Sequence, residues 1–240
     1  MKKLTQVIAV LLTVPLATTP LLAAGPLGID VTSAQGTINW ASVKSDGVTF
    51  AYAQATSGSA GHDTKFIANM TNGKAAGVYM GAAHFAQPEF DTPALEASNF
   101  WSFASSQIGK GGKNIMPALE FEVFSGHVGA GSYTGWANNW SSAVVADAAA
   151  VGITLHPVIY ITPCNACNLT TNITLYPWIA NPNGTGGPWN VCTNCEAWGP
   201  DVWDLWQTST SGAISGISGP VDLDTFNGSL SALTSLLQTK

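Results

Sequence analysis

Segments with strand character alternate with segments with helix character along the first two thirds of the chain, and this order restricts the fold more than any other feature. Strands separated by helices usually run parallel, as βαβ units. After residue 161 the helices disappear, and short strands are separated by loops rich in Gly, Pro and Asn. The predicted strands cover residues 27–31, 48–55, 78–85, 115–123, 153–161, 176–180, 202–207 and 220–223, and the predicted helices cover residues 39–44, 64–76, 92–108 and 132–151.

Eight strands with a helix-poor last third predict an α/β fold, a single-domain TIM-like barrel whose final repeats are irregular. The alternative is an open, doubly wound sheet. A nucleotide-binding sheet of that kind would carry a Gly-x-Gly-x-x-Gly or P-loop motif, and the sequence contains neither.

The amino-terminal segment has the layout of a secretory signal peptide. Lys2 and Lys3 give a positive start, residues 7–22 are mostly apolar, and small residues follow at 23–25. We therefore expect residues 1–24 to be removed and residues 25–240 to form the exported domain. An uncleaved anchor is the alternative, although the apolar stretch is broken by Thr and Pro, and no later segment is long enough to span a membrane.

Charged residues are scarce, which limits the ligands that the chain can bind. They make up 9% of the sequence, Arg is absent, and the net charge is −6. Nucleic acids and anionic membranes are bound by clustered cations, so this balance argues against both as partners. A neutral ligand rich in hydroxyl and amide groups, such as a glycan, suits a chain with nine Trp and five Tyr.

Four cysteines form two Cys-x-x-Cys motifs, at Cys164 and Cys167 and at Cys192 and Cys195. Export favours disulfides, whereas the same spacing in a cytosolic protein favours structural zinc. Three disulfide pairings exist, and the sequence does not choose among them. Either way, the motifs indicate cross-linked loops rather than a catalytic centre.

Two acids interrupt the fourth predicted strand. Leu119 and Phe121 fall on one face of this strand, and Glu120 and Glu122 fall on the other. In a parallel barrel the apolar face meets the helices, so both carboxyl groups should point inward at the carboxyl end, where barrel active sites are built. Such close carboxyl groups raise one another's pKa, which yields the acid–carboxylate pair that glycoside hydrolysis uses.

Further acids are predicted at the same end of the barrel. Asp30 lies at the carboxyl end of the first strand, and Asp222 and Asp224 lie near the eighth, which adjoins the first strand when a barrel closes. His84 ends the third strand, and the fifth, sixth and seventh carry further candidates for contact with sugar. The predicted substrate-binding residues are His84, Tyr160, Trp178, Trp206, Gln207 and Asp224.

Several of these segments together resemble family 25 of the glycoside hydrolases, which are secreted lysozymes of the N-acetylmuramidase type. The resemblance covers nearly all of the chain after residue 24, in the same order. Its most specific parts are Gly-Ile-Asp-Val near the start and Val-Asp-Leu-Asp-x-Phe-Asn-Gly near the end. The matching segments are residues 28–31, 84–88, 117–122, 206–207 and 216–228.

The resemblance implies a barrel of five β/α units completed by three strands, that is, (β/α)5(β)3. It also implies cleavage of the β-1,4 bond between N-acetylmuramic acid and N-acetylglucosamine in peptidoglycan, with retention. Glu122 matches the residue that protonates the leaving oxygen. Asp30 and Asp222 match acids that tune the site. Glu120 stands where the family has an Asp that orients the substrate's own N-acetyl group for attack.

This sequence departs from the family at two places near the site. Glu120 is one methylene longer than the usual Asp, and residues 54–58 read Gln-Ala-Thr-Ser-Gly in place of Lys-Ala-Thr-Glu-Gly. Two alternative functions follow, a glycan-binding relative with weakened catalysis and a hydrolase for another N-acetylated glycan such as chitin. We expect a secreted monomer with no cofactor and no catalytic metal; His62, His127 and His156 lack metal-ligand spacing.

Overall fold

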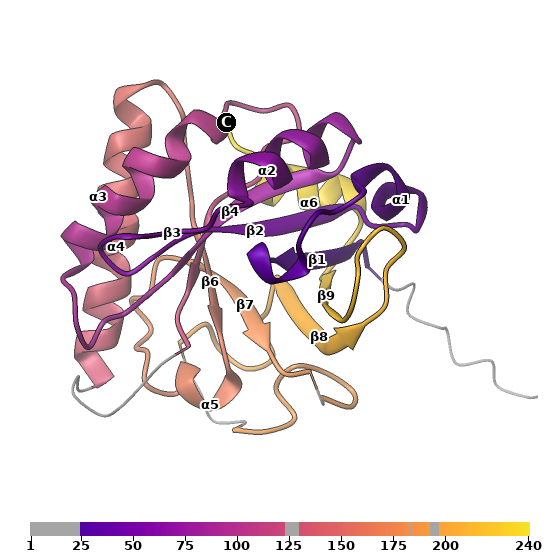
Figure 1. Ribbon diagram of the computed structural model, residues 1–240. Helices are drawn as coiled ribbons and strands as arrows, with labels where there is room; N and C mark the ends of the chain where they lie inside the picture. Colours follow the sequence, from indigo (N-terminus) through magenta and orange to yellow (C-terminus); the bar gives the residue numbers. More distant parts are fainter. Residues whose placement is uncertain (1–24, 123–129, 183, 193–196) are drawn as a thin grey trace, which may run out of the picture.

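The computed structural model describes residues 25–122, 130–182, 184–192 and 197–240. The predicted signal peptide, residues 1–24, lies outside this part of the chain, as does Cys195. Figure 1 shows a twisted barrel with helices along its upper and left sides and loops below it.

Eight strands close the barrel, as the sequence predicted. Each strand pairs with the next around the ring, and the ring closes because β1 pairs with both β2 and β9. A short extra strand, β3 (Gly61–His62), adds only to the end of β2. The barrel strands are β1 (Leu27–Val31), β2 (Phe50–Ser57), β4 (Tyr79–Phe85), β5 (Ala118–Glu120), β6 (Val158–Ile161), β7 (Tyr176–Ala180), β8 (Leu205–Gly212) and β9 (Val221–Phe226).

The last strand differs in direction from all the others in the barrel. Pairings from β1 through β2 and β4 to β8 are parallel, but β9 runs antiparallel to both β8 and β1. The start of β9 therefore lies where β1 and β8 end. This reversal places the first residues of β9 at the carboxyl rim of the barrel, the rim that carries active sites in β/α barrels.

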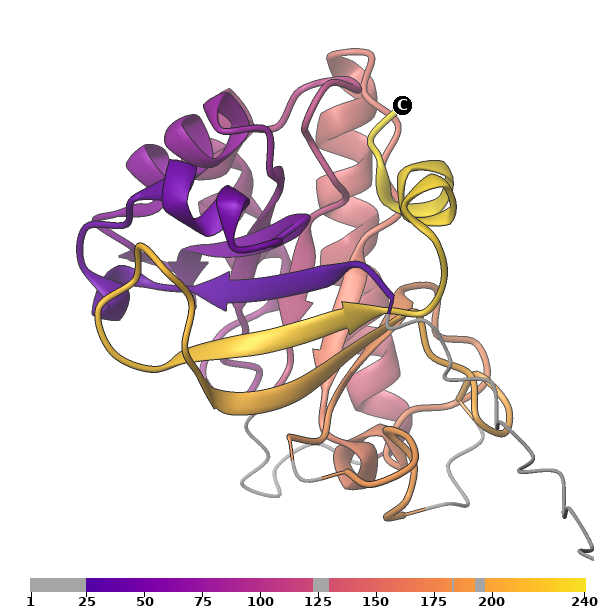
Figure 2. The ribbon, with the colours of Figure 1, turned by 90° about the vertical axis from the view of Figure 1, so that its right-hand side faces the viewer.

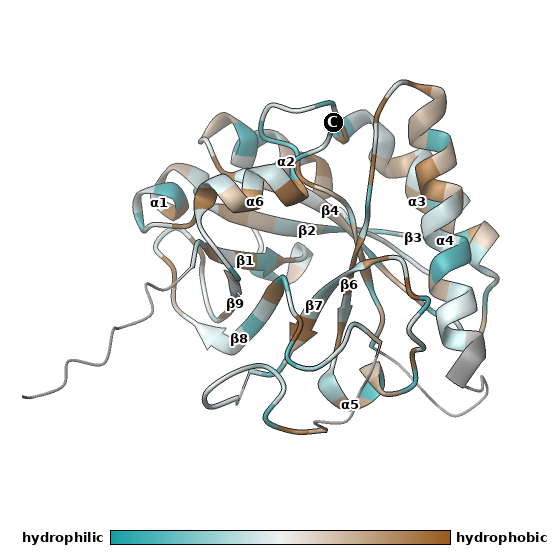
Figure 3. Ribbon diagram, turned by 180° about the vertical axis from the view of Figure 1, so that it is seen from behind, coloured by the Kyte–Doolittle hydropathy of each residue, from teal (hydrophilic) through white to brown (hydrophobic). Residues whose placement is uncertain are grey.

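Helices follow the first strands and then become short, in agreement with the predicted pattern. The four predicted helices are present as α1 (Trp40–Ser45), α2 (Phe66–Ala75), α3 (Pro93–Ala104) and α4 (Ala130–Ala150). In Figure 3, hydrophobic and hydrophilic residues alternate along α3 and α4, as expected of helices that lay one face on a barrel. Short 3-10 turns lie at Ser33–Gln35 and Ser105–Gln107.

Two helices were not predicted. One is the single turn α5 (Pro163–Ala166), which follows β6. The other is α6 (Leu230–Leu237), which starts where the Ser229 side chain accepts a hydrogen bond from the Ala232 amide, and which buries Leu233 and Leu237.

Two predicted strands are shorter than expected because the carboxyl-terminal segment pairs with the residues before them. The strand predicted at 115–123 forms only at Ala118–Glu120, since Ile115 bridges to Gln238. The strand predicted at 153–161 begins at Val158, because Thr154 exchanges backbone hydrogen bonds with Lys240. The end of the chain thus ties down the amino-terminal side of β5 and β6.

The two cysteine motifs are joined by a disulfide between Cys164 and Cys192, whose Cα atoms are 5.1 Å apart. This bond links α5 to the loop before β8. A zinc site using all four thiolates is thereby ruled out, because two of its ligands are consumed. Among the described residues, no helix is long and apolar enough to cross a membrane.

Candidate active site

Four carboxyl groups from three strands meet at the carboxyl rim of the barrel. Asp30 on β1 lies opposite Asp222 on β9 in the antiparallel ladder, and their side chains share a hydrogen bond. Glu120 ends β5, and Glu122 follows two residues later on the same side of the extended chain. The charges of Asp30, Glu122 and Asp222 all act on Glu120. The structure thus brings together the four acids that the sequence suggested as catalytic.

The surroundings of the cluster raise the pKa of its carboxyl groups and so favour their protonated forms. Burial, followed by the charge of Asp222, raises the pKa of Asp30 to about 8. Burial also raises the pKa of Glu120 well above its ordinary value, with further contributions from Asp30 and Glu122. Like charges this close cannot all ionise in a site of low polarity. Part of the cluster therefore stays protonated at neutral pH.

Glu122 differs from the other three acids in its exposure. Its side chain is exposed, whereas Asp30, Glu120 and Asp222 are half-buried. Partial burial of its carboxyl group raises the pKa of Glu122, and its hydrogen bond with the Tyr160 hydroxyl opposes this effect. An exposed acid with a raised pKa can deliver a proton to a bound ligand near neutral pH.

Gln207 on β8 connects the two sides of the cluster. Its Nε2 donates to Asp30 Oδ2 over 3.0 Å, and its Oε1 accepts from the Tyr160 hydroxyl over 2.9 Å. The Tyr160 hydroxyl, at the end of β6, also neighbours Glu122. Two of the predicted substrate-binding residues, Tyr160 and Gln207, therefore hold the acids in place from within the barrel.

Sequence reasoning missed one residue at this site, Asn165. It lies on α5 between the two cysteines of the first motif, and its side-chain amide donates to the backbone carbonyl of Glu122 over 3.3 Å. The disulfide at Cys164 thus fixes a turn that holds the backbone of Glu122. The position inside a Cys-x-x-Cys motif was the available signal, but nothing in the sequence connected that loop to the acids.

Trp178 and Asp224 lie below the cluster, inside the barrel. Neither has any exposed surface, and the Trp178 indole N–H donates to Asp224 Oδ1 over 3.0 Å. Tyr52 packs on Trp178 with ring centroids 4.7 Å apart. The structure places these two predicted substrate-binding residues in the layer that supports the acids, away from the surface.

His84 and Trp206 do not join the cluster. His84 is fully buried between the barrel wall and the helices, where its ring nitrogens bind Thr56 and Glu96, each at 2.7 Å. Trp206 precedes the inward-facing Gln207, so its side chain lies on the outer face of β8, where it donates to the Asn181 carbonyl over 3.0 Å.

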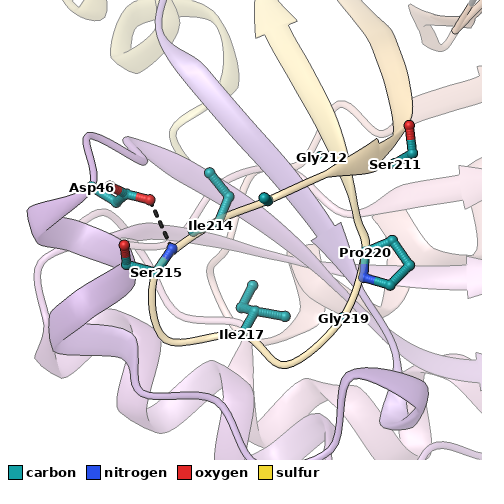
Figure 4. A pocket seen from close by; sticks show the side chains of 9 residues that line it. Asp46, Ser211, Gly212, Ile214, Ser215, Ile217, Gly219 and Pro220 are labelled. Atoms are coloured by element: carbon teal, nitrogen blue, oxygen red, sulfur yellow. Dashed lines mark hydrogen bonds between the residues drawn. The ribbon is translucent and has the colours of Figure 1, made fainter.

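A hollow of about 540 Å³ beside the loop between β8 and β9 contains none of these acids. Figure 4 shows its lining, in which Asp46 at the end of α1 accepts a hydrogen bond from the Ser215 amide over 2.7 Å. This contact attaches the loop to α1, and the hollow carries no acid–base pair.

Stability should fall as the cluster ionises. In the unfolded chain Asp30 ionises near pH 4, but in the folded protein it holds its proton to about pH 8. A raised folded-state pKa gives stability that is complete below the unfolded pKa and is lost as pH rises through the folded one. We expect Asp30→Asn, which keeps an acceptor for Gln207, to raise the melting temperature relative to wild type by an amount that grows from pH 4 to pH 8.

Melting curves of both proteins across this pH range measure the effect. Asp147→Asn, at an exposed position on α4, is the control and should show no such growth. A difference between wild type and Asp30→Asn that is constant with pH would contradict the raised pKa.

Comparisons with known proteins agree with the fold. The model of the family described as glycosyl hydrolases family 25 matches residues 29–217. Lysozyme M1 from Streptomyces globisporus is 35% identical over 223 residues, which are 90% of this chain and 73% of that protein.

Solved structures give the same result. A bacterial lysozyme from Streptomyces coelicolor superposes with a TM-score of 0.74 at 32% identity, covering 89% of this chain and 97% of that one. A family 25 lysozyme from Aspergillus fumigatus, at 21% identity, shares the fold with a TM-score of 0.72 over 89% of this chain and 99% of its own. The chain with this acid-lined barrel therefore belongs to family 25 of the glycosyl hydrolases.

Proposed function

We propose that this hydrolase is a lysozyme that cleaves the β-1,4 bond between N-acetylmuramic acid and N-acetylglucosamine in peptidoglycan. The observation that carries the proposal is the exposed Glu122 carboxyl group beside three half-buried acids at the barrel rim. The similarity to lysozymes from two Streptomyces species supports the choice of substrate.

Glu122 acts as the general acid. It is the most exposed acid of the cluster, and its raised pKa favours the protonated form from which the reaction starts. As the glycosidic C–O bond breaks, Glu122 gives its proton to the leaving oxygen. The resulting carboxylate then takes a proton from water in the second step.

Glu120 orients the N-acetyl group of the sugar whose bond is cleaved. The carbonyl oxygen of that group attacks the anomeric carbon and forms a positively charged ring, which water later opens. Those of the three acids Asp30, Glu120 and Asp222 that are ionised stabilise this positive charge. Two displacements at one carbon leave the configuration retained, without a covalent bond to the protein.

Analysis of the reaction products tests this function. We expect purified peptidoglycan to release fragments with N-acetylmuramic acid at the reducing end, as identified by mass, and we expect the first product to be the β anomer by NMR. Reducing ends on N-acetylglucosamine would contradict the bond assignment, and an initial α anomer would contradict retention. Turnover of chitin oligomers as fast as that of peptidoglycan would favour the alternative that the enzyme also hydrolyses other N-acetylated glycans.

We also propose that residues 1–24 direct export and are removed. The Cys164–Cys192 disulfide supports this proposal, because such bonds persist mainly outside the cytosol. Mass measurement of the protein recovered from the culture medium tests it. An intact amino terminus, or retention in the cell, would count against export and removal.

A further inference from the structure

In the part of the chain that the structure describes, one wall of the barrel has no helix over its outer face. Figure 2 shows β1, β9 and β8 side by side across the front of the molecule, with α6 beyond their edge. On this wall Leu27 of β1, Thr225 of β9 and Trp206 of β8 stand in one row, because Thr225 pairs with both of the others. These side chains point away from the barrel interior, opposite to Asp222 and Gln207.

This row forms part of a groove of about 1340 Å³. Residues from the start of β1, the loop before β8, β9 and the start of α6 line it. The volume exceeds the roughly 300–1000 Å³ of ordinary small-molecule pockets, which suits an extended ligand. The four cluster acids are absent from the lining, so the groove lies on the reverse side of the strands that carry Asp30 and Asp222.

The chemistry of the lining matches an uncharged sugar chain. Trp203 and Trp206 are half-buried and meet edge to face with ring centroids 5.9 Å apart. Thr208 and Thr225 also line the groove, and the Thr208 hydroxyl donates to the Leu223 carbonyl over 3.1 Å. Among the described residues that line the groove, Asp224 alone has an ionisable side chain, and its carboxyl group is directed inward to the Trp178 indole. Removal of residues 1–24 would add the α-amino group of Gly25, which also lines the groove. Aromatic rings beside hydroxyl-bearing side chains, with no accessible acidic side chain, favour a glycan over a cationic partner.

We propose that this groove is a second, non-catalytic binding site for an N-acetylated glycan strand. The choice of ligand rests on the proposed lysozyme function. Peptidoglycan presents many parallel strands, so a site on the reverse wall can hold one strand while the acid cluster cleaves another. The overall affinity for the insoluble substrate rises because two binding events are linked on one protein.

Binding to insoluble peptidoglycan tests the proposal without cleavage. The full chain with Glu122→Gln serves as the background, and its co-sedimentation with purified peptidoglycan is measured. Trp203→Ala in this background is expected to weaken binding about tenfold, the usual scale for losing a buried aromatic anchor. Leu230→Glu, which places a charge at the groove edge where the side chain is 48% exposed, should weaken it several-fold.

Val151→Glu is the matched control. Val151 is 65% exposed and follows α4, which lies on the opposite side of the barrel, so binding should be unchanged. With Glu122 restored, Trp203→Ala should hydrolyse short soluble peptidoglycan fragments at the wild-type rate.

Equal binding by Trp203→Ala and Val151→Glu would overturn the proposal. The proposal would also be overturned if Trp203→Ala lost as much activity on soluble fragments as it lost binding to insoluble peptidoglycan. A dimer in solution that dissociates with Leu230→Glu would overturn it too. If the wild-type protein bound peptidoglycan through Trp203 but released no fragments, the lysozyme function would fail while the groove would remain a glycan site.

Discussion

Glu122→Gln is expected to lower the turnover of peptidoglycan about a thousandfold, within the 10²–10⁴ range of general acid catalysis. Gln has nearly the same size as Glu and its amide can still form a hydrogen bond with the Tyr160 hydroxyl, but it has no acidic proton for the leaving oxygen. Substrate binding should persist, so the loss should appear in kcat rather than in KM. Steady-state release of reducing ends measures both constants.

The pH dependence of the wild-type enzyme separates this role from a structural one. The acid must be protonated, so activity should decline as pH rises through the raised pKa of Glu122. That alkaline decline should be missing from the residual activity of Glu122→Gln. Activity above about a tenth of wild type, or an unchanged pH profile, would assign the proton transfer to another group.

The sequence predicted the acid cluster because charges are scarce in this chain. Two carboxyl residues in an otherwise apolar strand have few structural explanations, and the period of two placed Glu120 and Glu122 on one face. The structure shortens the strand to Ala118–Glu120, so Glu122 lies beyond its end. The alternation still holds there, because the Phe121 amide bonds to the Tyr160 carbonyl and keeps the chain extended.

Other features depended on contacts that local patterns do not encode. The direction of β9 follows from its short connection to β8, and only that reversal places Asp222 opposite Asp30. The C-terminal helix α6 is short, and its ordering comes from burying Leu233 and Leu237.

The prediction that Trp206 contacts substrate beside Gln207 conflicts with the alternation of side chains along a strand. Neighbouring strand residues face opposite sides, so Trp206 and Gln207 cannot both point to the acids. The structure directs Gln207 inward to Asp30 and Tyr160, and it leaves Trp206 on the outer wall.

His84 shows why a polar residue in a strand is a weak sign of a site. Its partners, Thr56 on β2 and Glu96 on α3, are distant in sequence, so the sequence could not show that its hydrogen bonds are satisfied inside the protein. Glu96 also accepts from the Gln87 amide at 3.0 Å, and both His84 and Glu96 have no exposed surface. This group fixes α3 to the barrel wall.

Removing Glu96 should therefore destabilise the protein strongly. Glu96→Ala leaves the His84 Nε2 and the Gln87 amide without their partner and opens a cavity in the wall. Two buried donors without partners, together with the cavity, cost about 3–5 kcal/mol. For a chain of this length we expect the melting temperature to fall by roughly 6–20 °C. Thermal denaturation by circular dichroism measures the change.

Glu96→Gln is the matched variant, because an amide can replace both contacts. Its oxygen can accept from Gln87, and its NH2 can donate to the His84 Nε2 if the ring carries its proton on Nδ1, facing Thr56. This tautomer is accessible because burial lowers the pKa of His84, although Glu96 opposes that shift. We expect Glu96→Gln to lower the free energy of unfolding by about 1 kcal/mol.

Both variants should hydrolyse peptidoglycan at the wild-type rate per folded molecule, because His84 and Glu96 lie behind the barrel wall. An equal loss of stability in the two variants would show that side-chain volume, rather than hydrogen bonding, holds α3 in place.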